Sequence, residues 1–400
     1  MTQKIDAKEL DVIVIGAGPA GGSVARELAK RGRKVLLIER SQEIGEPNYS
    51  TAGTSKETVD EFGLPEKILS ATWDTFLFAT PRVQASFKYP GGKGYVLDFA
   101  GLKRFLVEDA AYYGAEVMVG TNVSEFIEEG ERFSGVRYHG SLGSGEARAK
   151  LIIDATGHNE LANAKLKINP LSTEWLGNAM EYVMTNVPES LKTTLAFYFG
   201  SEYAYRGYSW IFPMNGNRDA KVGTSALGPM PKDKSLEDLQ KKFINALPYF
   251  EKMEPIEIHA GAARADGGVK NHVYKNIVLI GDSAHQINPL LGEGIRHALF
   301  AGRLAAGIID QWLSEKDAND GDLKRRYEAA WKKKFGTAWR LSNLAIKYAA
   351  GFNDKQWDET IEAIGKLSPD DFFRLISDYD PKVLLKYPSL AAKMIKIKLS

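Results

Sequence analysis

The chain has 400 residues, with 52 lysine and arginine residues against 51 aspartate and glutamate residues and a net charge of +1. A balance this close to zero argues against a dedicated nucleic-acid-binding protein, which usually carries a strongly basic face. The sequence has no cysteine, which excludes disulfides, thiolate metal sites, iron–sulfur clusters and cysteine nucleophiles. No apolar run reaches the roughly 20 residues of a transmembrane helix, and the polar first residues do not resemble a signal peptide, so we expect a cytoplasmic protein.

The first forty residues alternate between strand and helix patterns. Residues 11–15 form a β-branched apolar run, residues 16–22 predict a turn, residues 23–30 have helical spacing, and residues 35–38 predict a second strand. This alternation is typical of a βαβ unit and implies a parallel sheet.

The turn of this unit contains the motif Gly-x-Gly-x-x-Gly, formed by Gly16, Gly18 and Gly21. The glycines permit a tight turn and let the backbone approach a pyrophosphate. The start of the following helix, near Ala20, supplies N–H groups and a positive dipole end. Glu39 ends the second strand, where a carboxylate can accept hydrogen bonds from a ribose diol. The sequence therefore predicts a dinucleotide site at the start of the chain.

Strand and helix signals continue along the middle of the chain. Residues 76–99 predict a strand pair with its turn at residues 90–92, and residues 102–113 predict a helix. Residues 115–153 predict a strand meander with a turn at residues 140–145. The glycines of that last turn lack the strand-to-helix context of a nucleotide site, so we expect a hairpin there.

The second half of the chain begins with a stretch rich in β-branched and aromatic residues. Residues 176–227 predict an antiparallel sheet. Ser235 then begins a helix, with Asp238 three residues later as a capping box. Residues 322–400 predict mainly helices.

Two later segments indicate that the dinucleotide is a flavin. Residues 151–157 end an apolar strand with small residues, which lets the chain pass close to a bound nucleotide. Residues 277–285 contain another apolar strand that runs into Asp282, whose carboxylate can hold a ribityl hydroxyl. The backbone from Gly292 to Gly294 then presents N–H groups at a helix start, which would stabilise negative charge on the pyrimidine edge of a reduced flavin.

In this order the three segments resemble those of FAD enzymes built like p-hydroxybenzoate hydroxylase. The resemblance extends from residue 11 to about residue 310. It implies an α/β fold in which a Rossmann-like FAD-binding domain carries an inserted antiparallel-sheet substrate domain and a helical C-terminus. We expect the FAD-binding domain to comprise residues 1–75, 96–160 and 270–320, the substrate domain residues 76–95 and 161–269, and the helical region residues 321–400.

An aromatic segment narrows the family. The sequence from Tyr208 through Trp210 and Phe212 to Pro213 closely resembles the Tyr-x-Trp-x-Phe-Pro signature of the geranylgeranyl reductase family. Strand alternation places the three aromatic residues on one face. There they can form a wall for a polyprenyl chain, and the same pattern also suits aromatic pairs packed inside a sheet. We expect the four residues to bind substrate.

The resemblance implies FAD-dependent reduction of isoprenoid double bonds, with hydride delivered to one alkene carbon and a proton to the other. The expected substrate is a hydrophobic polyprenyl lipid or diphosphate. The chain has no second nucleotide motif, which leaves NADPH, ferredoxin and a reduced quinone open as electron donors, so the partners include an electron-donor protein if the donor is ferredoxin. The alternatives are an FAD-dependent monooxygenase of an aromatic or lipid substrate, a redox-neutral enzyme of the lycopene cyclase type, and a flavin- or lipid-binding protein without turnover.

The resemblance also implies roles for single residues. Many family members carry a cysteine soon after the second strand, where this chain has Ser50 or Thr51, so Tyr49 and Ser50 are candidate proton donors. His285 lies next to the flavin segment, where it can aid proton transfer or serve the structure. Members usually have an arginine before the helix near Leu102, and Lys103 or Arg104 is its candidate substitute. The expected FAD-binding residues are Gly16, Gly18, Ala20, Gly21, Glu39, Arg40, Lys103, Asp282, Pro289, Gly292, Gly294 and Ile295.

The histidines and Glu293 are further candidates for a functional role. The six histidines are scattered and form no His-Glu-x-x-His pattern, so we expect no metal. Glu293 suits either a helix N-terminal cap or an active-site role.

In the C-terminal tail, Leu390, Met394 and Ile397 share one helical stripe, while Lys393 and Lys396 lie on another side. This amphipathic pattern is typical of peripheral contact with the cytoplasmic face of a membrane.

Overall fold

The computed structural model describes residues 10–141, 143–252 and 255–388, and it separates into two compact units. Each unit is assembled from three separate stretches of the chain. The first unit comprises Met1–Asn48, Phe99–Ser172 and Ala263–Arg340, and the second comprises Tyr49–Asp98, Thr173–Ala262 and Leu341–Ser400. Both units are therefore discontinuous in the sequence, and they alternate along it.

The unit boundaries differ from the expected domain boundaries at several places, and most at three of them. Residues 49–75, expected in the nucleotide domain, belong to the second unit, because two of their strands pair there with residues 94–97. Residues 161–172, expected in the substrate domain, belong to the first unit. The C-terminal helices are shared: residues 321–340 belong to the first unit and residues 341–400 to the second.

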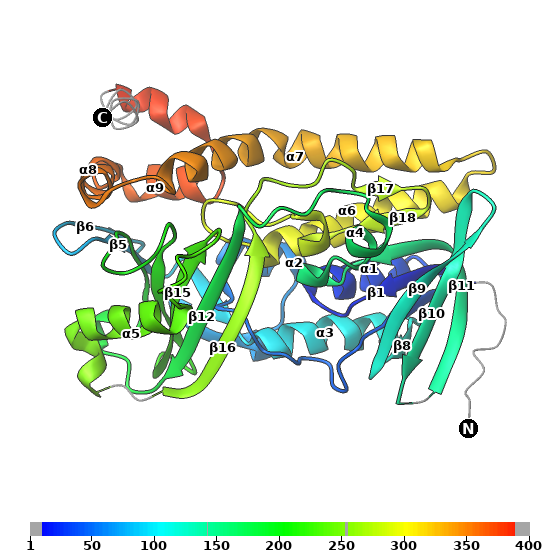
Figure 1. The fold of residues 1–400 in the computed structure, drawn as a ribbon, viewed down its shortest axis with the longest axis horizontal. Coiled ribbons are helices and arrows are strands. Elements are labelled where there is room, and N and C mark those ends of the chain that lie inside the picture. Colours follow the sequence, from blue (N-terminus) through cyan, green and yellow to red (C-terminus); the bar gives the residue numbers. More distant parts are fainter. Residues whose placement is uncertain (1–9, 142, 253–254, 389–400) are drawn as a thin grey trace. The chain divides into compact units, whose positions relative to one another are not determined.

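The first unit is built on a sheet whose central strand is β1 (Figure 1). β1 pairs in parallel with β2 and with β11, and β11 pairs in parallel with β18. The apolar runs at residues 12–15 and 151–153 are fully buried there, as expected for strands covered on both faces. In sheet order the strands are β17 (Val273–Tyr274), β18 (Ile277–Leu279), β11 (Gly143–Asp154), β1 (Leu10–Ile15), β2 (Val35–Ile38) and β8 (Glu116–Met118).

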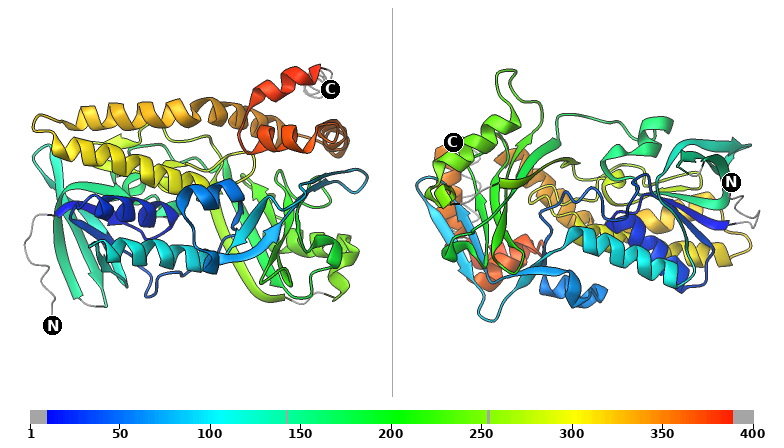
Figure 2. Two further views of the ribbon diagram at one scale, coloured as in Figure 1. Left: turned by 180° about the vertical axis from the view of Figure 1, so that it is seen from behind. Right: turned by 90° about the horizontal axis from the view of Figure 1, so that it is seen from below.

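Small residues let the helices of this unit pack closely on α1 (Pro19–Lys30). A Cβ atom at Gly22 would lie 2.8 Å from the Leu106 side chain of α3 (Phe99–Tyr112). A Cβ atom at Gly302 of α6 (Ile295–Ser314) would lie 2.7 Å from Ser23, whose hydroxyl donates to the Leu299 carbonyl. α6 in turn runs beside α7 (Asp320–Ala349), as Figure 2 shows. Helix α1 therefore packs closely against both α3 and α6.

The predicted strand meander and its hairpin are confirmed. β9 (Thr121–Glu129) pairs antiparallel with β10 (Arg132–Gly140), which pairs antiparallel with β11. The β10–β11 hairpin turns between Gly140 and Gly143, with no helix after it. α4 (Leu161–Leu166) completes this part of the first unit.

The second unit contains a seven-stranded sheet, which confirms the antiparallel sheet predicted for residues 176–227. β12 pairs antiparallel with β15, β15 with β14, β14 with β13, and β5 with β6, whereas β13 pairs in parallel with β5. In sheet order the strands are β16 (Pro255–Arg264), β12 (Leu176–Met184), β15 (Asp219–Leu227), β14 (Ser209–Met214), β13 (Thr194–Tyr198), β5 (Thr75–Ala79) and β6 (Gln84–Lys88).

The two faces of this sheet have different partners. One face carries Ile211 and Val222 and packs against α5 (Leu236–Ala246), which begins with the predicted capping box and lies along the sheet in Figure 2. The other face carries the aromatic side chains of β14. Toward β6 this second face is covered by α9 (Pro369–Ile376), where the Phe372 ring stacks on Phe87 at 3.7 Å. α9 therefore covers the end of this face that β5 and β6 form.

The remaining elements of the second unit are shorter. β3 (Gly53–Ser55), β7 (Gly94–Leu97) and β4 (Leu69–Trp73) form a three-stranded sheet beside α2 (Lys56–Phe62), and α8 (Asp354–Ile364) follows α7. In both units, short 3₁₀ helices lie at Glu66–Ile68, Gly157–Asn159, Glu189–Leu191, Pro248–Lys252, Gly281–Ala284 and Pro381–Lys386. Across the described residues, no helix combines the length and the apolar character needed to cross a membrane.

Three sequence expectations about elements need correction. The strand pair at residues 76–99 turns at residues 80–83, not at 90–92, because the Thr80 hydroxyl and amide close that turn onto Val83. Residues 90–92 instead lead from β6 into the other sheet. The helix expected from residue 102 begins at Phe99, and the one expected from residue 23 begins at Pro19, so Gly21 lies inside it.

Candidate active site

The glycine turn of the first unit is dictated by close packing at two of its three glycines. Gly16 has a φ of +98°, and a Cβ atom there would overlap the Ala155 carbonyl. A Cβ atom at Gly21 would overlap the carbonyl oxygen of Gly16. Strand β1, helix α1 and the end of β11 therefore meet at these two positions with no room for any other residue.

Gly18 has a different role, because a Cβ atom there would meet nothing within 4 Å. It is the N-cap of α1, its own backbone is extended, and no side chain caps the helix. The first turn, which includes Ala20, holds no acidic residue. The open space beside Gly18 thus lies at a helix start whose N–H groups and dipole favour an anion, which fits the pyrophosphate of FAD.

Glu39 is held at the end of β2 by two backbone groups. Its Oε2 accepts a hydrogen bond of 2.7 Å from the amide of Ala17, and its Oε1 accepts one of 2.8 Å from the amide of Ser41. A carboxylate oxygen can accept more than one hydrogen bond, so Glu39 keeps acceptor capacity for a ribose diol. Arg40, also expected at the cofactor, donates to the side chain of Asn159 at 3.2 Å.

The flavin segment of the sequence is placed against the same turn. Asp282 follows β18 in the 3₁₀ helix Gly281–Ala284. A Cβ atom at Gly281 would lie 2.7 Å from the Ala20 side chain, so this segment touches the start of α1. The Asp282 carboxylate lies 3.7 Å from the Cβ position of Gly294, at the N-cap of α6. Burial raises the pKa of Asp282 to about 6, with a smaller opposing effect of the nearby His285 charge.

The loop before α6 differs from the sequence expectation at Gly292. The expected row of free N–H groups from Gly292 to Gly294 is wrong at its first member, because the Gly292 amide donates to the Asn288 carbonyl at 2.9 Å. The loop closes on itself around Asn288, and the buried Pro289 lies within it. The helix start at Gly294 and Ile295 has no side-chain cap and no acidic residue in its first turn, so it keeps the expected character of an anion site.

Lys103 and Glu293 each have a partner within the first unit. The buried Lys103 ammonium donates to the Pro47 carbonyl at 2.8 Å and lies 4.8 Å from the ring centre of Phe99. Burial lowers the pKa of Lys103 to about 8 despite the carboxylates of Glu39 and Glu46 nearby. Glu293 forms an ion pair of 2.8 Å with Arg296, one turn along α6, and Gly294 rather than Glu293 is the N-cap of that helix.

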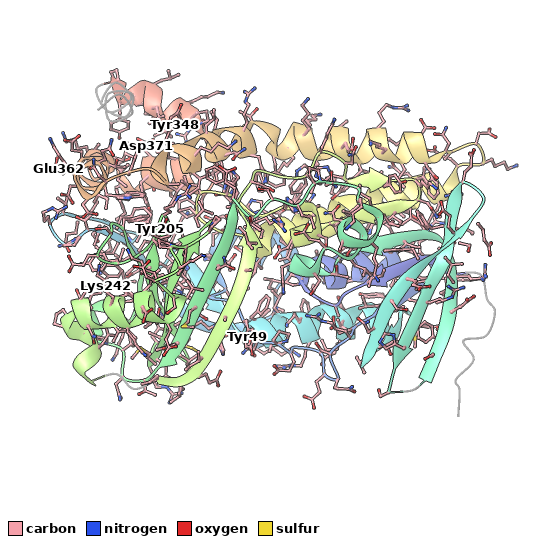
Figure 3. The ribbon with its side chains drawn as sticks, viewed as in Figure 1. Tyr49, Tyr205, Lys242, Tyr348, Glu362 and Asp371 are labelled. Carbon is pink, nitrogen blue, oxygen red and sulfur yellow. The ribbon has the colours of Figure 1, made fainter. Side chains whose placement is uncertain are left out.

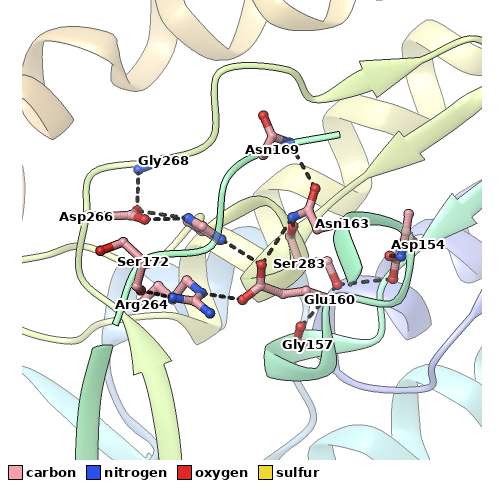
Figure 4. Close-up of polar contacts among 12 residues, drawn as sticks. Asp154, Gly157, Glu160, Asn163, Asn169, Ser172, Arg264, Asp266, Gly268 and Ser283 are labelled. Atoms are coloured by element: carbon pink, nitrogen blue, oxygen red, sulfur yellow. Dashed lines mark hydrogen bonds and ion pairs between the residues drawn. The ribbon is translucent and has the colours of Figure 1, made fainter. Parts of the chain in front are cut away.

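His285 is enclosed between two carboxylates (Figure 4). Its Nδ1 donates to Asp266 at 2.9 Å and its Nε2 donates to Glu160 at 2.9 Å. Burial disfavours the imidazolium, but the two hydrogen bonds outweigh it and raise the pKa of His285 to about 9. Glu160 also pairs with Arg264. With both ring nitrogens engaged, the geometry favours the structural alternative for His285 over proton transfer.

The charged residues around His285 were missed in the sequence because they come from distant segments. Asp154, at the end of β11, is fully buried and accepts hydrogen bonds from Thr156, Ala162 and Ser283. Figure 4 shows Ser283 beside Asp154. Its neighbour Glu160 has a φ of +47°. The one local indication of this network in the sequence is Asp154, which directly follows the apolar residues 151–153 of a strand.

In the second unit, the aromatic residues of β14 lie together as predicted. The rings of Tyr208 and Trp210 are 5.9 Å apart, and Phe197 of the neighbouring strand lies 5.5 Å from Tyr208 and 5.2 Å from Phe212. We call Tyr208, Trp210 and Phe212 the aromatic wall. Pro213 does not belong to it: it follows Phe212 in an unbroken register, so it lies on the opposite face of the strand.

A buried carboxylate lies beside the aromatic wall. Trp210 on β14 and Glu181 on β12 both stand opposite Gly223 of the strand between them. The Trp210 indole lies across Gly223, where a Cβ atom would overlap the ring. Its Nε1 donates to Glu181 Oε2 at 3.0 Å, and the Thr51 hydroxyl donates to the same oxygen at 2.5 Å.

A lysine and a histidine accompany this carboxylate. The buried Lys221 ammonium donates to the Ser50 carbonyl, and the Nδ1 of His259 lies 3.6 Å from Glu181 Oε1. Tyr49, which is half exposed and labelled in Figure 3, places its ring 4.9 Å from that of His259. Burial alone would raise the pKa of Glu181, but His259 and Lys221 lower it; the same contact with Glu181 raises the pKa of His259.

The structure thus links Tyr49 and Ser50, the proposed proton donors, to the aromatic wall. The link is a charged cluster that the sequence did not reveal. Glu181, Lys221 and His259 lie on three different strands and form no motif. A glutamate inside an apolar strand was the one available signal. The described residues contain no group of three or more histidine, aspartate or glutamate side chains arranged to hold a metal ion.

The chain is similar to known protein families and to individual proteins. Residues 11–184 match the family described as FAD dependent oxidoreductase, and residues 176–263, which include Glu181, Trp210 and His259, match the geranylgeranyl reductase catalytic domain. The digeranylgeranylglycerophospholipid reductase 2 of Methanopyrus kandleri is 30% identical, covering 96% of this chain and 98% of that protein. The digeranylgeranylglycerophospholipid reductase of Methanocaldococcus jannaschii is 31% identical, covering 95% and 96%.

A solved structure has the same fold along the whole chain. The geranylgeranyl bacteriochlorophyll reductase-like protein of Thermoplasma acidophilum superimposes with a TM-score of 0.86 at 25% identity, covering 96% of this chain and 99% of that one. The similarity includes both units and their order in the sequence. The chain therefore belongs to the geranylgeranyl reductase family of FAD-dependent oxidoreductases.

Proposed function

We propose that this protein reduces carbon–carbon double bonds in the geranylgeranyl chains of a glycerophospholipid. The observation that carries the proposal is the aromatic wall, in which Trp210 and Phe212 lie on one face of β14 and Tyr208, just before the strand, places its ring 5.9 Å from that of Trp210. A polyprenyl chain has no polar groups along its length, so an apolar surface of this kind suits it. The names of the relatives that match along the whole chain support the phospholipid as substrate.

The residues of the first unit would hold the cofactor. The open space at Gly18 and the start of α1 accept the pyrophosphate, Glu39 accepts hydrogen bonds from the ribose, and Asp282 accepts them from the ribityl chain. The helix start at Gly294 supports negative charge on the flavin ring. When bound, FAD supplies the hydride of the reduction. The protein's own task at the other unit is to hold the prenyl chain and exclude water from it.

The test is an anaerobic reaction of the purified flavoprotein. The protein is reduced with dithionite and mixed with digeranylgeranylglycerophospholipid or with geranylgeranyl diphosphate, while flavin absorbance and product mass are followed. Flavin reoxidation with a gain of two hydrogen atoms per double bond is the expected result, faster with the phospholipid. An unchanged product mass would point to redox-neutral chemistry, and a hydroxylated product formed only with oxygen would point to a monooxygenase. NADPH, ferredoxin and a reduced quinone can then replace dithionite in turn to identify the physiological donor.

The aromatic wall can be tested separately from the fold. Trp210→Ala should abolish lipid-dependent flavin reoxidation while bound FAD is retained. Trp312→Phe is a suitable control, because Trp312 also donates an indole hydrogen bond, to the Asn319 carbonyl, but lies in the first unit. If Trp210→Ala lowers only the melting temperature, the wall is a packed core and the substrate assignment fails.

A membrane contact is part of the same proposal. The amphipathic pattern of Leu390, Met394 and Ile397 lies outside the described residues, so the proposal rests on the sequence and on the lipid character of the substrate. Flotation with anionic phospholipid vesicles should carry the full chain, and neutral vesicles should carry less. Equal behaviour in both would contradict a contact made through the lysine-rich tail.

A further inference from the structure

The aromatic wall adjoins a charged cluster that an apolar substrate does not explain. Glu181 and His259 have side chains that are each only 7% exposed. Burying a charged group is costly unless it is paired and hydrogen-bonded. The Thr51 hydroxyl and the Trp210 indole satisfy one oxygen of Glu181, and Lys221 supplies a positive charge nearby. Burial of these charged groups therefore costs free energy, and packing of the aromatic wall alone would not require them.

The two facing atoms of this pair are incompletely satisfied. Glu181 Oε1 and His259 Nδ1 are buried, and neither has a hydrogen-bond partner among the described residues. They lie 3.6 Å apart, just beyond hydrogen-bond reach. A small side-chain movement closes that gap, so the pair can exchange a proton.

The outer nitrogen of the same imidazole leads to solvent. His259 Nε2 donates to Glu257 Oε2 at 2.9 Å, and the Glu257 side chain is 59% exposed. Both residues lie on β16, two positions apart. The imidazole thus bridges an exposed carboxylate and a buried one. A histidine in such a position can take a proton at one nitrogen and release one from the other.

The charges around the imidazole favour its protonated form. The groups that face it are Glu181 on β12, Glu257 on β16, Lys221 on β15 and Tyr49 from the segment before β3. Lys221 already balances the Glu181 carboxylate. Glu181 and Glu257 both stabilise the imidazolium and raise the pKa of His259 against the opposing effects of burial and Lys221, so the ring holds a proton that it can pass on.

We propose that Glu257, His259 and Glu181 form a proton relay from solvent to the aromatic wall, which supplies the proton that completes each double-bond reduction. The inference rests on the proposed function. One alkene carbon receives a hydride from the reduced cofactor and its neighbour receives the proton. The π bond breaks, two C–H bonds form, and the cofactor is oxidised by two electrons. The relay regains its proton from water through Glu257.

The first experiment compares pH profiles under single-turnover conditions. The rate of lipid-dependent flavin reoxidation is measured for the wild type, Glu181→Gln, His259→Gln and the control His139→Gln, which alters an exposed histidine on β10. Both relay variants should lose about a hundredfold or more in rate, the usual contribution of a positioned acid, and their pH profiles should flatten. His139→Gln should match the wild type. Bound FAD and melting temperature are measured on every variant.

Two further readouts separate a relay from a structural role. Added imidazole should restore part of the rate to His259→Ala, which a purely structural defect would not show. In the oxidised protein without lipid, nuclear magnetic resonance titration of the His259 ring should show a lower pKa in Glu181→Gln than in the wild type. If Glu181→Gln does not fold, His259→Ala and imidazole decide the question.

The outcomes distinguish the two proposals. A wild type that reduces the lipid, with relay variants of unchanged rate and pH profile, overturns the relay and leaves the proposed function in place. A wild type that reduces no prenyl lipid overturns both. Loss of rate without imidazole rescue, together with an unchanged His259 pKa in Glu181→Gln, also overturns the relay.

Discussion

The indole of Trp210 donates a hydrogen bond of 3.0 Å to the buried carboxylate of Glu181, across a strand that contributes only the hydrogen atom of Gly223 between them. The two side chains come from strands that are not neighbours in the sheet, so the contact depends on the missing side chain of the strand that separates them. This single bond joins the aromatic wall to the charged cluster and fixes the orientation of the indole.

Gly223→Ala should therefore displace Trp210. The added methyl group would overlap the indole, and overpacking of this kind costs typically 1–3 kcal/mol of unfolding free energy. Lipid-dependent flavin reoxidation should fall more than stability accounts for, with FAD content unchanged. Gly261→Ala is the matched control, because a Cβ atom there meets nothing within 4 Å. Equal activity of the two variants would contradict the dependence of the wall on Gly223.

The second and third glycines of the nucleotide motif, Gly18 and Gly21, should respond differently to alanine. Gly21→Ala places a methyl group on the Gly16 carbonyl and should prevent stable folding of the first unit. Gly18→Ala meets no described atom, and its φ of −69° suits alanine, so the apoprotein should keep its melting temperature. Its affinity for FAD should drop about tenfold or more, because the methyl group enters the space for the pyrophosphate. Titration of apoprotein with FAD measures this, and unchanged affinity would place the pyrophosphate elsewhere.

Asp282→Asn should have opposite effects on stability and on cofactor binding. Burial raises the pKa of Asp282 to about 6. A carboxyl group whose pKa is raised in the folded state destabilises the protein as pH rises from about 4 through 6. At pH 7 the apoprotein variant should therefore be more stable than the wild type, by about 1–2 kcal/mol. Its FAD affinity should fall about tenfold. Denaturant unfolding and FAD titration check the two effects, and a less stable apoprotein would contradict the first.

His285 should make stability depend on alkaline pH. Its pKa of about 9 lies above the ordinary value near 6.5, so its contribution is fully present below about pH 6.5 and is lost as pH rises through 9. The loss should be at most about 3 kcal/mol. Denaturant unfolding between pH 6 and pH 9.5 measures it, with His285→Gln as the variant that removes this part of the dependence. A variant that keeps the full dependence would assign it to another group.

Local sequence patterns predicted those parts of the fold that depend on neighbours in the chain. Gly16 and Gly18 lie in the turn where their spacing placed them, Gly21 lies in the first turn of α1 instead, and the capping box at Ser235 is present. The hairpin at residues 80–83 was missed because Thr-Pro-Arg-Val contains no glycine or asparagine, while the glycines at 91 and 92 mark a connection between two sheets.

The parts that depend on distant segments were not predictable in the same way. Trp210 was recognised from its motif, but the partner that orients it, Glu181, is defined only by strand register. Whether His285 serves chemistry or structure was open until Asp266 and Glu160 were seen on either side of it. The position of Pro213 follows from strand alternation, which the motif as a string of letters does not show.

The contact of Gly281 with Ala20 has a consequence for biosynthesis. The phosphate turn leaves the ribosome first, but the segment that carries Asp282 and Gly294 is made only after the whole antiparallel sheet between them. A nascent chain that ends before Asp282 lacks five of the twelve residues that we expect to bind FAD. Cofactor capture must therefore come late in synthesis, and the early βαβ unit has to remain soluble without the ligand for which its turn is shaped.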